Sequence, residues 1–111
     1  LEEADLTLDQ AIPCGLLVNE LITNALKYAW NSEETGTITI NLSEVEGIVF
    51  LEISDDGVGL PFIFEEAKSD TLGLQLVVTL VEQLDGEIIT DSQNGTKYLI
   101  KFGNIKPRSN V

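Results

Sequence analysis

Hydrophobic positions along the chain predict two helices. The first begins near Asp9, a plausible N-cap, and ends around Trp30. Pro13 is acceptable there because it lies close to the first turn. The second helix opens within residues 71–74 and carries apolar side chains at three- and four-residue spacing. Gly86 is placed to terminate it.

Four strands accompany these helices. Strict alternation over residues 37–42 predicts a half-buried strand, and residues 43–47 are expected to connect it to the next one. Residues 48–54 are apolar on both faces, which predicts a central strand. Residues 87–90 and 96–102 predict two more strands, the last of which carries Tyr98, Ile100 and Phe102 on one face.

The remaining segments complete the expected architecture. Residues 1–8 resemble a short or incomplete edge strand, residues 62–71 a loop, and residues 104–111 a flexible tail. The order helix, hairpin, loop, helix, hairpin predicts a single α/β (α+β) domain over residues 1–111. Its expected form is a two-layer sandwich, in which both helices cover one face of a mixed, largely antiparallel sheet.

One polar strip interrupts the apolar surface of the first helix. At about 100° per residue, Glu20, Asn24 and Lys27 lie within about 60° of one another. A helix that is apolar around most of its girth is normally buried, so the strip could face a ligand or a metal. The alternative is an ordinary solvent-exposed face, because charged side chains are rarely buried. The helix alone does not decide between the two.

Composition excludes several classes of chemistry. The net charge of −13 argues against nucleic acid as a partner, since backbone binding needs a basic surface. The absence of histidine removes histidine-based acid–base chemistry and histidine metal ligands. Cys14 is the single cysteine, and its apolar helical setting indicates a core residue. No apolar run is long enough to span a bilayer, and the start without methionine suggests a fragment of a longer protein.

Two glycine-containing stretches are candidates for ligand binding. Asp55-x-Gly57-x-Gly59 follows a buried strand, where an aspartate could accept a hydrogen bond from an amine and glycines allow close approach. Taken alone, this stretch is more simply a glycine-rich turn. Gly73 lies in the first turn of the second helix, where free N–H groups favour phosphate, although a packing glycine is the plainer interpretation. Residues 94–96, which include Gly95, are most simply interpreted as a hairpin turn.

Taken together and in this order, these stretches resemble the ATP-binding catalytic domain of sensor histidine kinases. That family belongs to the GHKL superfamily, with the Bergerat fold, which also includes DNA gyrase, a heat-shock chaperone and mismatch-repair ATPases. Residues 19–28 resemble the N box, 55–59 the first glycine box, 71–77 the second, and 95–96 the last glycine–threonine element. The resemblance covers about residues 8–102, and it is greatest to the subgroup with the second type of dimerisation region.

The resemblance implies an adenine-binding end. Asp55 would hydrogen-bond the adenine amine, and Tyr28 would lie against the ring. Gly57 and Gly59 would allow the backbone to come close to the nucleotide. Thr96 would support the polar network around Asp55.

The resemblance also implies a phosphate-binding end. Asn24 would coordinate Mg²⁺ through its amide oxygen, and Lys27 would offset phosphate charge. Gly73 and Leu74 would place N–H groups near the phosphates. Glu20 matches the acid that activates water in the hydrolysing superfamily members, and it is the candidate catalytic residue.

Two departures from the family pattern qualify these expectations. The segment from Leu60 to Thr71 would form the lid over the triphosphate. Leu60 itself is also expected to bind ATP. The second box has only Gly73 where many relatives have several glycines, which predicts a short or less ordered lid. The chain also lacks an acceptor histidine, so a separate upstream domain would have to supply it.

The function that the resemblance implies is transfer of the γ-phosphoryl group of ATP to that histidine. The implied partners are ATP, Mg²⁺, the upstream dimerisation and phosphoacceptor domain and, through the full kinase, a response regulator. Nucleic acid and direct membrane contact are not expected, and the expected location is cytoplasmic. The alternatives are an anti-sigma-factor-type serine kinase, which shares the same boxes, and a nucleotide-binding regulatory module without transfer chemistry.

Overall fold

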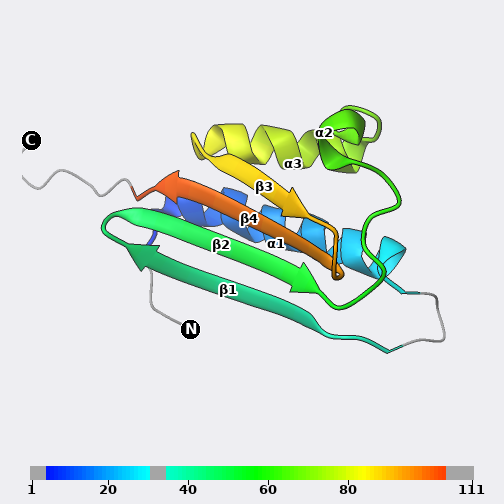
Figure 1. Cartoon of the computed structure of the whole chain (residues 1–111). Coiled ribbons are helices and arrows are strands. Elements are labelled where there is room, and N and C mark those ends of the chain that lie inside the picture. The colour runs from blue at the N-terminus through cyan, green and yellow to red at the C-terminus, as the bar shows by residue number, and fades with distance from the viewer. Residues whose placement is uncertain (1–4, 31–34, 105–111) are drawn as a thin grey trace, which may run out of the picture.

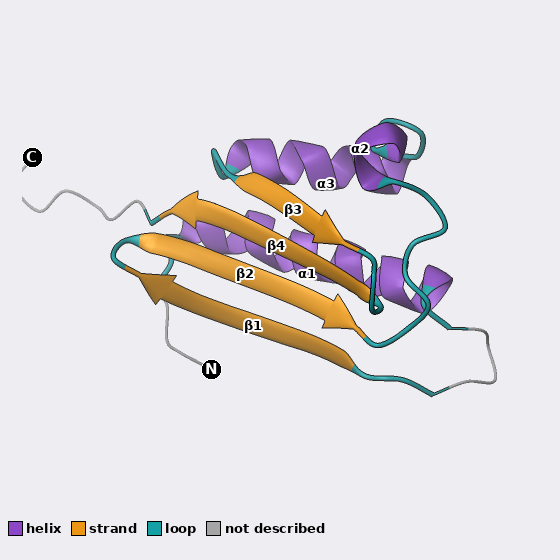
Figure 2. Cartoon of the chain, viewed as in Figure 1, coloured by secondary structure: helices purple, strands orange, loops and turns teal. Residues whose placement is uncertain are grey.

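The computed structural model describes residues 5–30 and 35–104, which form two layers (Figure 1). The helices and strands are, in chain order, α1 (Leu8–Tyr28), β1 (Ile38–Val45), β2 (Ile48–Asp55), α2 (Phe64–Ala67), α3 (Leu72–Gln83), β3 (Glu87–Asp91) and β4 (Thr96–Gly103). The helices lie on one side of the sheet, and within the described ranges no helix covers the other side (Figure 2). The predicted two-layer sandwich is confirmed.

The sheet has the strand order β1-β2-β4-β3, and every described pair of strands is antiparallel. The central position predicted for β2 is confirmed, because β2 pairs with both β1 and β4. Its inward side chains and those of β4 pack against α1 and α3. Of the core residues, Leu17, Leu21, Val49, Val77 and Ile100 are completely buried. The core therefore lies between the two long helices and the centre of the sheet.

α1 differs from its prediction at both ends. It begins at Leu8 with Thr7 as N-cap, so the prediction of Asp9 as the cap is wrong, and it ends at Tyr28 rather than near Trp30. Pro13 is buried and lies inside the helix, past the first turn, where its missing N–H leaves a helical hydrogen bond unmade. The helix persists because its apolar face is packed against the core. Although α1 has 21 residues, no helix in the described ranges is apolar enough to cross a membrane.

The connection between β1 and β2 is shorter than predicted. Val45 pairs with Ile48, so Glu46 and Gly47 alone form the turn. Their φ angles are 50° and 81°, the positive values required by a tight two-residue hairpin. The prediction of a connection over residues 43–47 is wrong, because polar side chains continue along this edge strand up to the turn.

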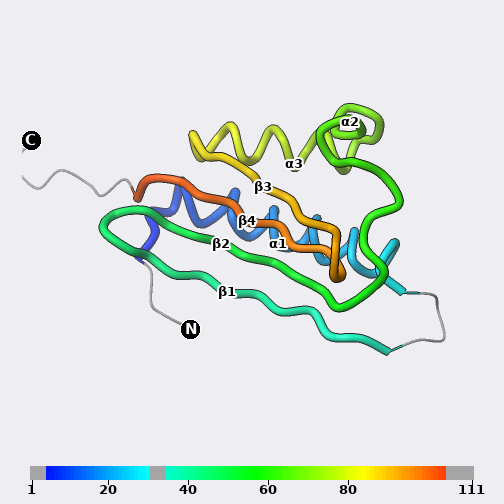
Figure 3. Tube along the Cα trace, in the orientation of Figure 1, coloured from blue at the N-terminus to red at the C-terminus, as the bar shows by residue number. Residues whose placement is uncertain are grey.

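The segment over residues 62–71 contains a short helix, α2, which the sequence pattern did not predict. One turn of helix is too short to show a period, but Phe64 and Ala67 are both buried and attach it to the core. The connection from β2 to α2 passes the end of α1, where the Val58 N–H donates to the Ala29 carbonyl at 2.9 Å (Figure 3). This bond places the glycine-rich turn beside α1.

The end of α3 also differs in detail from the prediction. Asp85, with φ 51°, adopts the left-handed conformation, and the Gly86 N–H donates to the Val81 carbonyl at 3.0 Å. Gly86 is needed for a different reason, since a Cβ there would lie 2.7 Å from the Lys101 carbonyl oxygen. The glycine marks the helix end through close packing on β4.

The two ends of the described chain lie together. The Asn104 side-chain amide donates to the Asp5 carbonyl at 2.7 Å, and the Asn104 backbone N–H donates to the Gly47 carbonyl at 2.8 Å. The predicted edge strand is not formed over residues 5–7, and residues 1–4 lie outside the described residues. The predicted tail begins at Asn104, which is held in place, and residues 105–111 also lie outside the described residues.

Candidate functional site

The polar strip on α1 is not a uniformly exposed face. Asn24 is 8% exposed and Glu20 is half-buried, whereas Lys27 is exposed. The Lys27 ammonium lies 5.1 Å from the centre of the Tyr28 ring, within the range of a cation–π contact. The solvent-face interpretation therefore fails for Asn24, whose amide is directed into the molecule.

Asp55 ends β2 and is fixed by two backbone N–H groups. Its Oδ1 accepts hydrogen bonds from the N–H of Gly57 at 2.9 Å and of Thr96 at 3.3 Å. Asp55 is 9% exposed and Thr96 3% exposed. Among the described residues, no donor bonds to the second carboxylate oxygen, Oδ2. One oxygen thus holds the turn, and the other is free to accept a hydrogen bond from an amine.

The glycines around Asp55 are required by packing. A Cβ on Gly57 would overlap the Ala29 carbonyl, and one on Gly59, with φ 87°, would lie 2.6 Å from the Ser92 carbonyl oxygen. Gly95 has φ 81°, and a Cβ there would overlap the Asp55 carbonyl. These glycines allow the backbone of neighbouring segments to pack closely. Close approach of a ligand to them stays a prediction.

Aromatic side chains lie beside this turn. Tyr28, at the end of α1, packs edge-to-face against Phe62 with ring centres 5.3 Å apart. Leu60 is half-buried and packs against the core. Phe62 was not among the predicted site residues, although an aromatic residue three positions after the glycine turn was an available signal. Tyr28 and Phe62 together supply an apolar surface where the connection after the glycine-containing turn meets the end of α1.

The first turn of α3 forms the second cluster. The Thr71 hydroxyl caps the helix by accepting from the Leu74 N–H at 3.2 Å, and the Leu74 side chain is buried in the core. The N–H predicted for phosphate binding at Leu74 is therefore engaged in this structure. The N–H groups of Leu72 and Gly73 have no bond to any described residue. Sequence reasoning missed Leu72, which precedes the glycine that drew attention.

Glu20 lies against this helix terminus. A Cβ on Gly73 would be 3.3 Å from the Glu20 Oε2 atom, so the glycine lets the carboxylate approach α3 closely. A carboxylate near the positive end of a helix dipole is electrostatically favourable. The fold therefore brings Glu20 and Gly73 close together, although they are far apart in the sequence.

α1 connects the two clusters. Gly57 packs against Ala29, the residue that follows α1, and Gly73 approaches the helix at Glu20. Glu20 and Ala29 are nine positions apart, which corresponds to about 14 Å at ~1.5 Å per residue. Asn24 lies between the two contacts. The arrangement offers an amine acceptor at one end, free N–H groups at the other, and a buried amide between them.

Buried polar atoms mark the middle of this arrangement. The Asn24 Nδ2 and Tyr98 Oη atoms are inaccessible to solvent, and neither has a partner of ordinary hydrogen-bond geometry among the described residues. Such atoms are uncommon in folded proteins and require an explanation. Tyr98 was predicted only as an inward-facing residue of β4, so its neighbourhood with Asn24 was not anticipated.

Cys14 takes no part in the site. It is buried in the core, and burial raises the pKa of its thiol to about 11. The thiol is therefore protonated at neutral pH and is a poor nucleophile. This agrees with the prediction of a structural cysteine.

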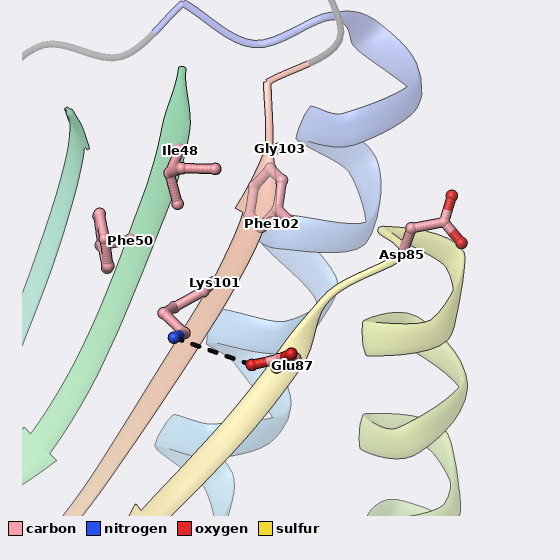
Figure 4. Close-up of a pocket in the computed structure, with 7 residues that line it drawn as sticks. All are labelled: Ile48, Phe50, Asp85, Glu87, Lys101, Phe102 and Gly103. Carbon is pink, nitrogen blue, oxygen red and sulfur yellow. Dashed lines mark ion pairs between the residues drawn. The ribbon is translucent and has the colours of Figure 1, made fainter. Parts of the chain in front are cut away.

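A hollow at the opposite end of the sheet is unrelated to these residues (Figure 4). Its volume is about 370 Å³, and its lining consists of Ile48, Phe50, Asp85, Glu87, Lys101, Phe102 and Gly103. The Lys101 Nζ atom is 3.8 Å from the Glu87 Oε2 atom, which offsets the one positive charge of the lining. Asp85 adds a further acid, so this hollow is unsuited to a triphosphate.

Comparisons with known proteins show which family this chain resembles. The family model for histidine kinase-, DNA gyrase B- and HSP90-like ATPases matches residues 9–105. The sensor histidine kinase PdtaS of Mycolicibacterium smegmatis is 39% identical over 82 residues, which are 72% of this chain and 16% of the relative. An anti-sigma F factor of Geobacillus kaustophilus is 29% identical over 108 residues, 89% of this chain and 73% of the relative.

A solved histidine kinase structure has the same fold as this chain. The histidine kinase domain of the Erythrobacter litoralis blue-light-activated kinase EL346 superposes with a TM-score of 0.82 and 28% identity. The match covers 93% of this chain and 48% of the solved chain. The chain thus spans a small part of the PdtaS kinase and about half of the solved kinase domain. Because the family model covers most of its length, this chain belongs to the family of histidine kinase-, DNA gyrase B- and HSP90-like ATPases.

Proposed function

We propose that this chain is the ATP-binding catalytic domain of a two-component sensor histidine kinase, a single domain that acts in the cytoplasm. It would transfer the γ-phosphoryl group of ATP to a histidine of a separate dimerisation domain and, through the full kinase, serve a response regulator. The observation that carries the proposal is that the turn after Asp55 approaches the chain at Ala29, and Gly73 approaches it at Glu20, two points about 14 Å apart along the direction of α1. That spacing suits a nucleotide laid along the helix.

The adenine would bind at the β2 end. Asp55 Oδ2 would accept a hydrogen bond from the exocyclic amine, while Oδ1 remains bonded to the Gly57 and Thr96 N–H groups. The ring would lie against the apolar surface of Tyr28 and Phe62. Because the fixed group is an acceptor, it favours an amine over the carbonyl oxygen of guanine.

The phosphates would bind at the α3 end. The free N–H groups of Leu72 and Gly73 lie at the positive end of a helix dipole, which stabilises anions. Lys27 is exposed and could reach phosphate oxygens. Since the chain carries a net charge of −13, such local positive features are needed to bind a triphosphate.

Magnesium fits the residues that are present. The described ranges contain no cluster of three or more acidic, histidine or cysteine side chains that could hold a metal alone. Magnesium commonly binds through one or two protein oxygens together with substrate phosphates. Asn24 would supply an amide oxygen from α1. When bound, the ion would neutralise developing charge on the phosphates.

Glu20 is the proposed catalytic acid–base residue. Its carboxylate lies beside the first turn of α3, where the terminal phosphate would be bound. A carboxylate at this position can accept a proton from, or orient, the attacking imidazole of the acceptor histidine. Most of the remaining catalysis would come from positioning and charge neutralisation.

The Asn24→Ala variant tests the metal site. We expect its affinity for a non-hydrolysable ATP analogue with Mg²⁺ to fall at least about tenfold, because a protein ligand of the ion is lost. Its affinity for ADP in the presence of a chelator should change little. Isothermal titration calorimetry on the 111-residue chain measures both values.

Asn19→Ala is the matched control, since Asn19 has the same side chain on an exposed part of α1. It should leave both affinities unchanged. If Asn24→Ala binds the magnesium complex as tightly as the native chain does, the proposed metal site is wrong.

The Glu20→Gln variant tests the transfer step. With a supplied acceptor domain and γ-labelled ATP, we expect phosphorylation of histidine to slow by about a hundredfold, because general acid–base catalysis typically contributes about that much or more. Nucleotide binding should persist. Glu82→Gln, which changes an exposed acid on α3, is the control and should transfer at the native rate. Equal rates in Glu20→Gln and the native chain would exclude Glu20 from the chemistry.

A serine kinase that acts on a partner protein is the second candidate. The supporting observation is that the chain spans 73% of the length of an anti-sigma F factor. The two functions differ in the bond formed, because phosphohistidine is lost in acid while phosphoserine survives. Acid-stable label on a serine of a supplied partner would favour the second candidate. Nucleotide binding without transfer to either acceptor would indicate a regulatory module.

A further inference from the structure

Tyr98 lies on the helix-facing side of β4 at the same end of the sheet as Asp55. It pairs with Ile53 of β2 and Thr90 of β3, which places it in the middle of the sheet. Its residue exposure is 2%, and its ring packs edge-to-face against Phe64 with ring centres 6.2 Å apart. The ring is thus fixed by packing, and its hydroxyl is held at a defined position beneath α1.

The Tyr98 hydroxyl faces the side chain of Asn24. Burial raises the pKa of Tyr98 to about 12, and the hydrogen-bonding influence of the Asn24 side chain acts in the opposite direction. At neutral pH the hydroxyl keeps its proton.

The buried unpaired atoms of this pair indicate how the Asn24 amide is oriented. Asn24 Nδ2 and Tyr98 Oη are both buried and both lack a partner of ordinary geometry, while the Asn24 oxygen is not among the buried unpaired atoms. A hydrogen bond from Nδ2 to Oη would satisfy both at once. The cost of leaving a buried polar group unpaired favours that bond.

We propose that Tyr98 is a positioning residue for the metal–nucleotide complex, because its hydroxyl accepts from Asn24 Nδ2 and turns the Asn24 oxygen toward the ion. The inference rests on the proposed function, in which Asn24 is the metal ligand. An amide has a donor end and an acceptor end of nearly the same shape. Without a partner for the nitrogen, part of the population would present N–H groups to the cation.

The Tyr98→Phe variant removes the hydroxyl and keeps the ring. We expect the affinity for a non-hydrolysable ATP analogue with Mg²⁺ to fall about three- to tenfold, the range of a single hydrogen bond. The affinity for ADP with a chelator should not change. The melting temperature should stay the same or rise, since the variant also removes a buried hydroxyl that lacks an ideally placed partner.

Ile100→Val is the matched control on the same strand. Ile100 is completely buried two residues from Tyr98, so this variant disturbs the packing of β4 and leaves the hydroxyl in place. It should lower the melting temperature and keep both nucleotide affinities. A similar loss of magnesium-dependent affinity in Ile100→Val would show that packing, not the hydroxyl, explains the effect and would overturn the inference.

A double variant separates the two proposals. In the Asn24→Ala background, Tyr98→Phe should have no further effect on magnesium-dependent binding, because the two residues act through one group. A further loss in that background, or an unchanged affinity in Tyr98→Phe alone while Asn24→Ala is defective, would overturn the role of Tyr98. If Asn24→Ala itself retains native magnesium dependence, the proposed metal site fails and the inference fails with it.

Discussion

Replacing Asp55 with asparagine is expected to weaken ATP binding by up to about a hundredfold while leaving the fold intact. The variant keeps Oδ1, so the Gly57 and Thr96 N–H groups retain their acceptor. It replaces Oδ2 with an NH₂ group, which cannot accept from the adenine amine. Loss of a charge-assisted bond costs about 1.5–3 kcal/mol. The penalty is larger still because the new NH₂ group, a donor, would face the adenine amine, which is also a donor.

The measurement is a comparison of ATP and GTP affinities by calorimetry. Because the asparagine NH₂ could donate to the guanine carbonyl, the GTP affinity should not fall in parallel with the ATP affinity. Asp56→Asn makes the same chemical change at the neighbouring residue, where Oδ1 accepts from the Thr37 N–H at 3.0 Å. That control should bind ATP normally. Native ATP affinity in Asp55→Asn would show that the adenine does not bind at Asp55.

Asp55→Ala separates binding from structure. It also removes the acceptor of two N–H groups, and each buried group left unpaired costs about 1–3 kcal/mol. We therefore expect both a loss of ATP binding and a lower melting temperature. The difference between the alanine and asparagine variants isolates the structural role of Oδ1.

Much of the fold followed from hydrophobic periodicity. The long helices, the central position of β2 and the inward face of β4 are set by which residues must be buried, and this information is local in sequence. The errors occurred where another contact decides the outcome. Pro13 remains inside α1 because tertiary packing outweighs its local cost, and Phe64 forms a one-turn helix because it fits the core.

The site was predictable to the extent that each residue type carries its own chemistry. Asp55 and Asn24 were recognisable as an acceptor and an amide on opposite layers. Thr96 was expected near Asp55 only through the family resemblance, and the proximity of Tyr98 to Asn24 was not expected at all, because both depend on the register of β2 with β4. Likewise, Gly57 appeared to be a ligand-contacting glycine, whereas its clearest role is to let the turn pack on Ala29.

Gly95→Ala is expected to be the most destabilising substitution among the glycines of the site. Gly95 has φ 81°, a conformation that costs a non-glycine residue about 1–2 kcal/mol. Its new Cβ would also overlap the Asp55 carbonyl, which is backbone and cannot move without opening the pairing of Asp55 with Thr96. We expect the free energy of unfolding to fall by about 3 kcal/mol or more, beyond the usual range for a single substitution.

Thermal and urea denaturation of the nucleotide-free chain test this expectation, with a predicted drop in melting temperature of at least about 10 °C. Gly103→Ala is the matched control, at the other end of β4, where no atom lies within 4 Å of the added Cβ and φ is not positive. It should be neutral or slightly stabilising, because alanine restricts the unfolded chain. Equal stability of the two variants would contradict the close packing of Gly95 on Asp55. Since that packing aligns the Thr96 N–H with Oδ1, any folded Gly95→Ala protein should also bind ATP weakly.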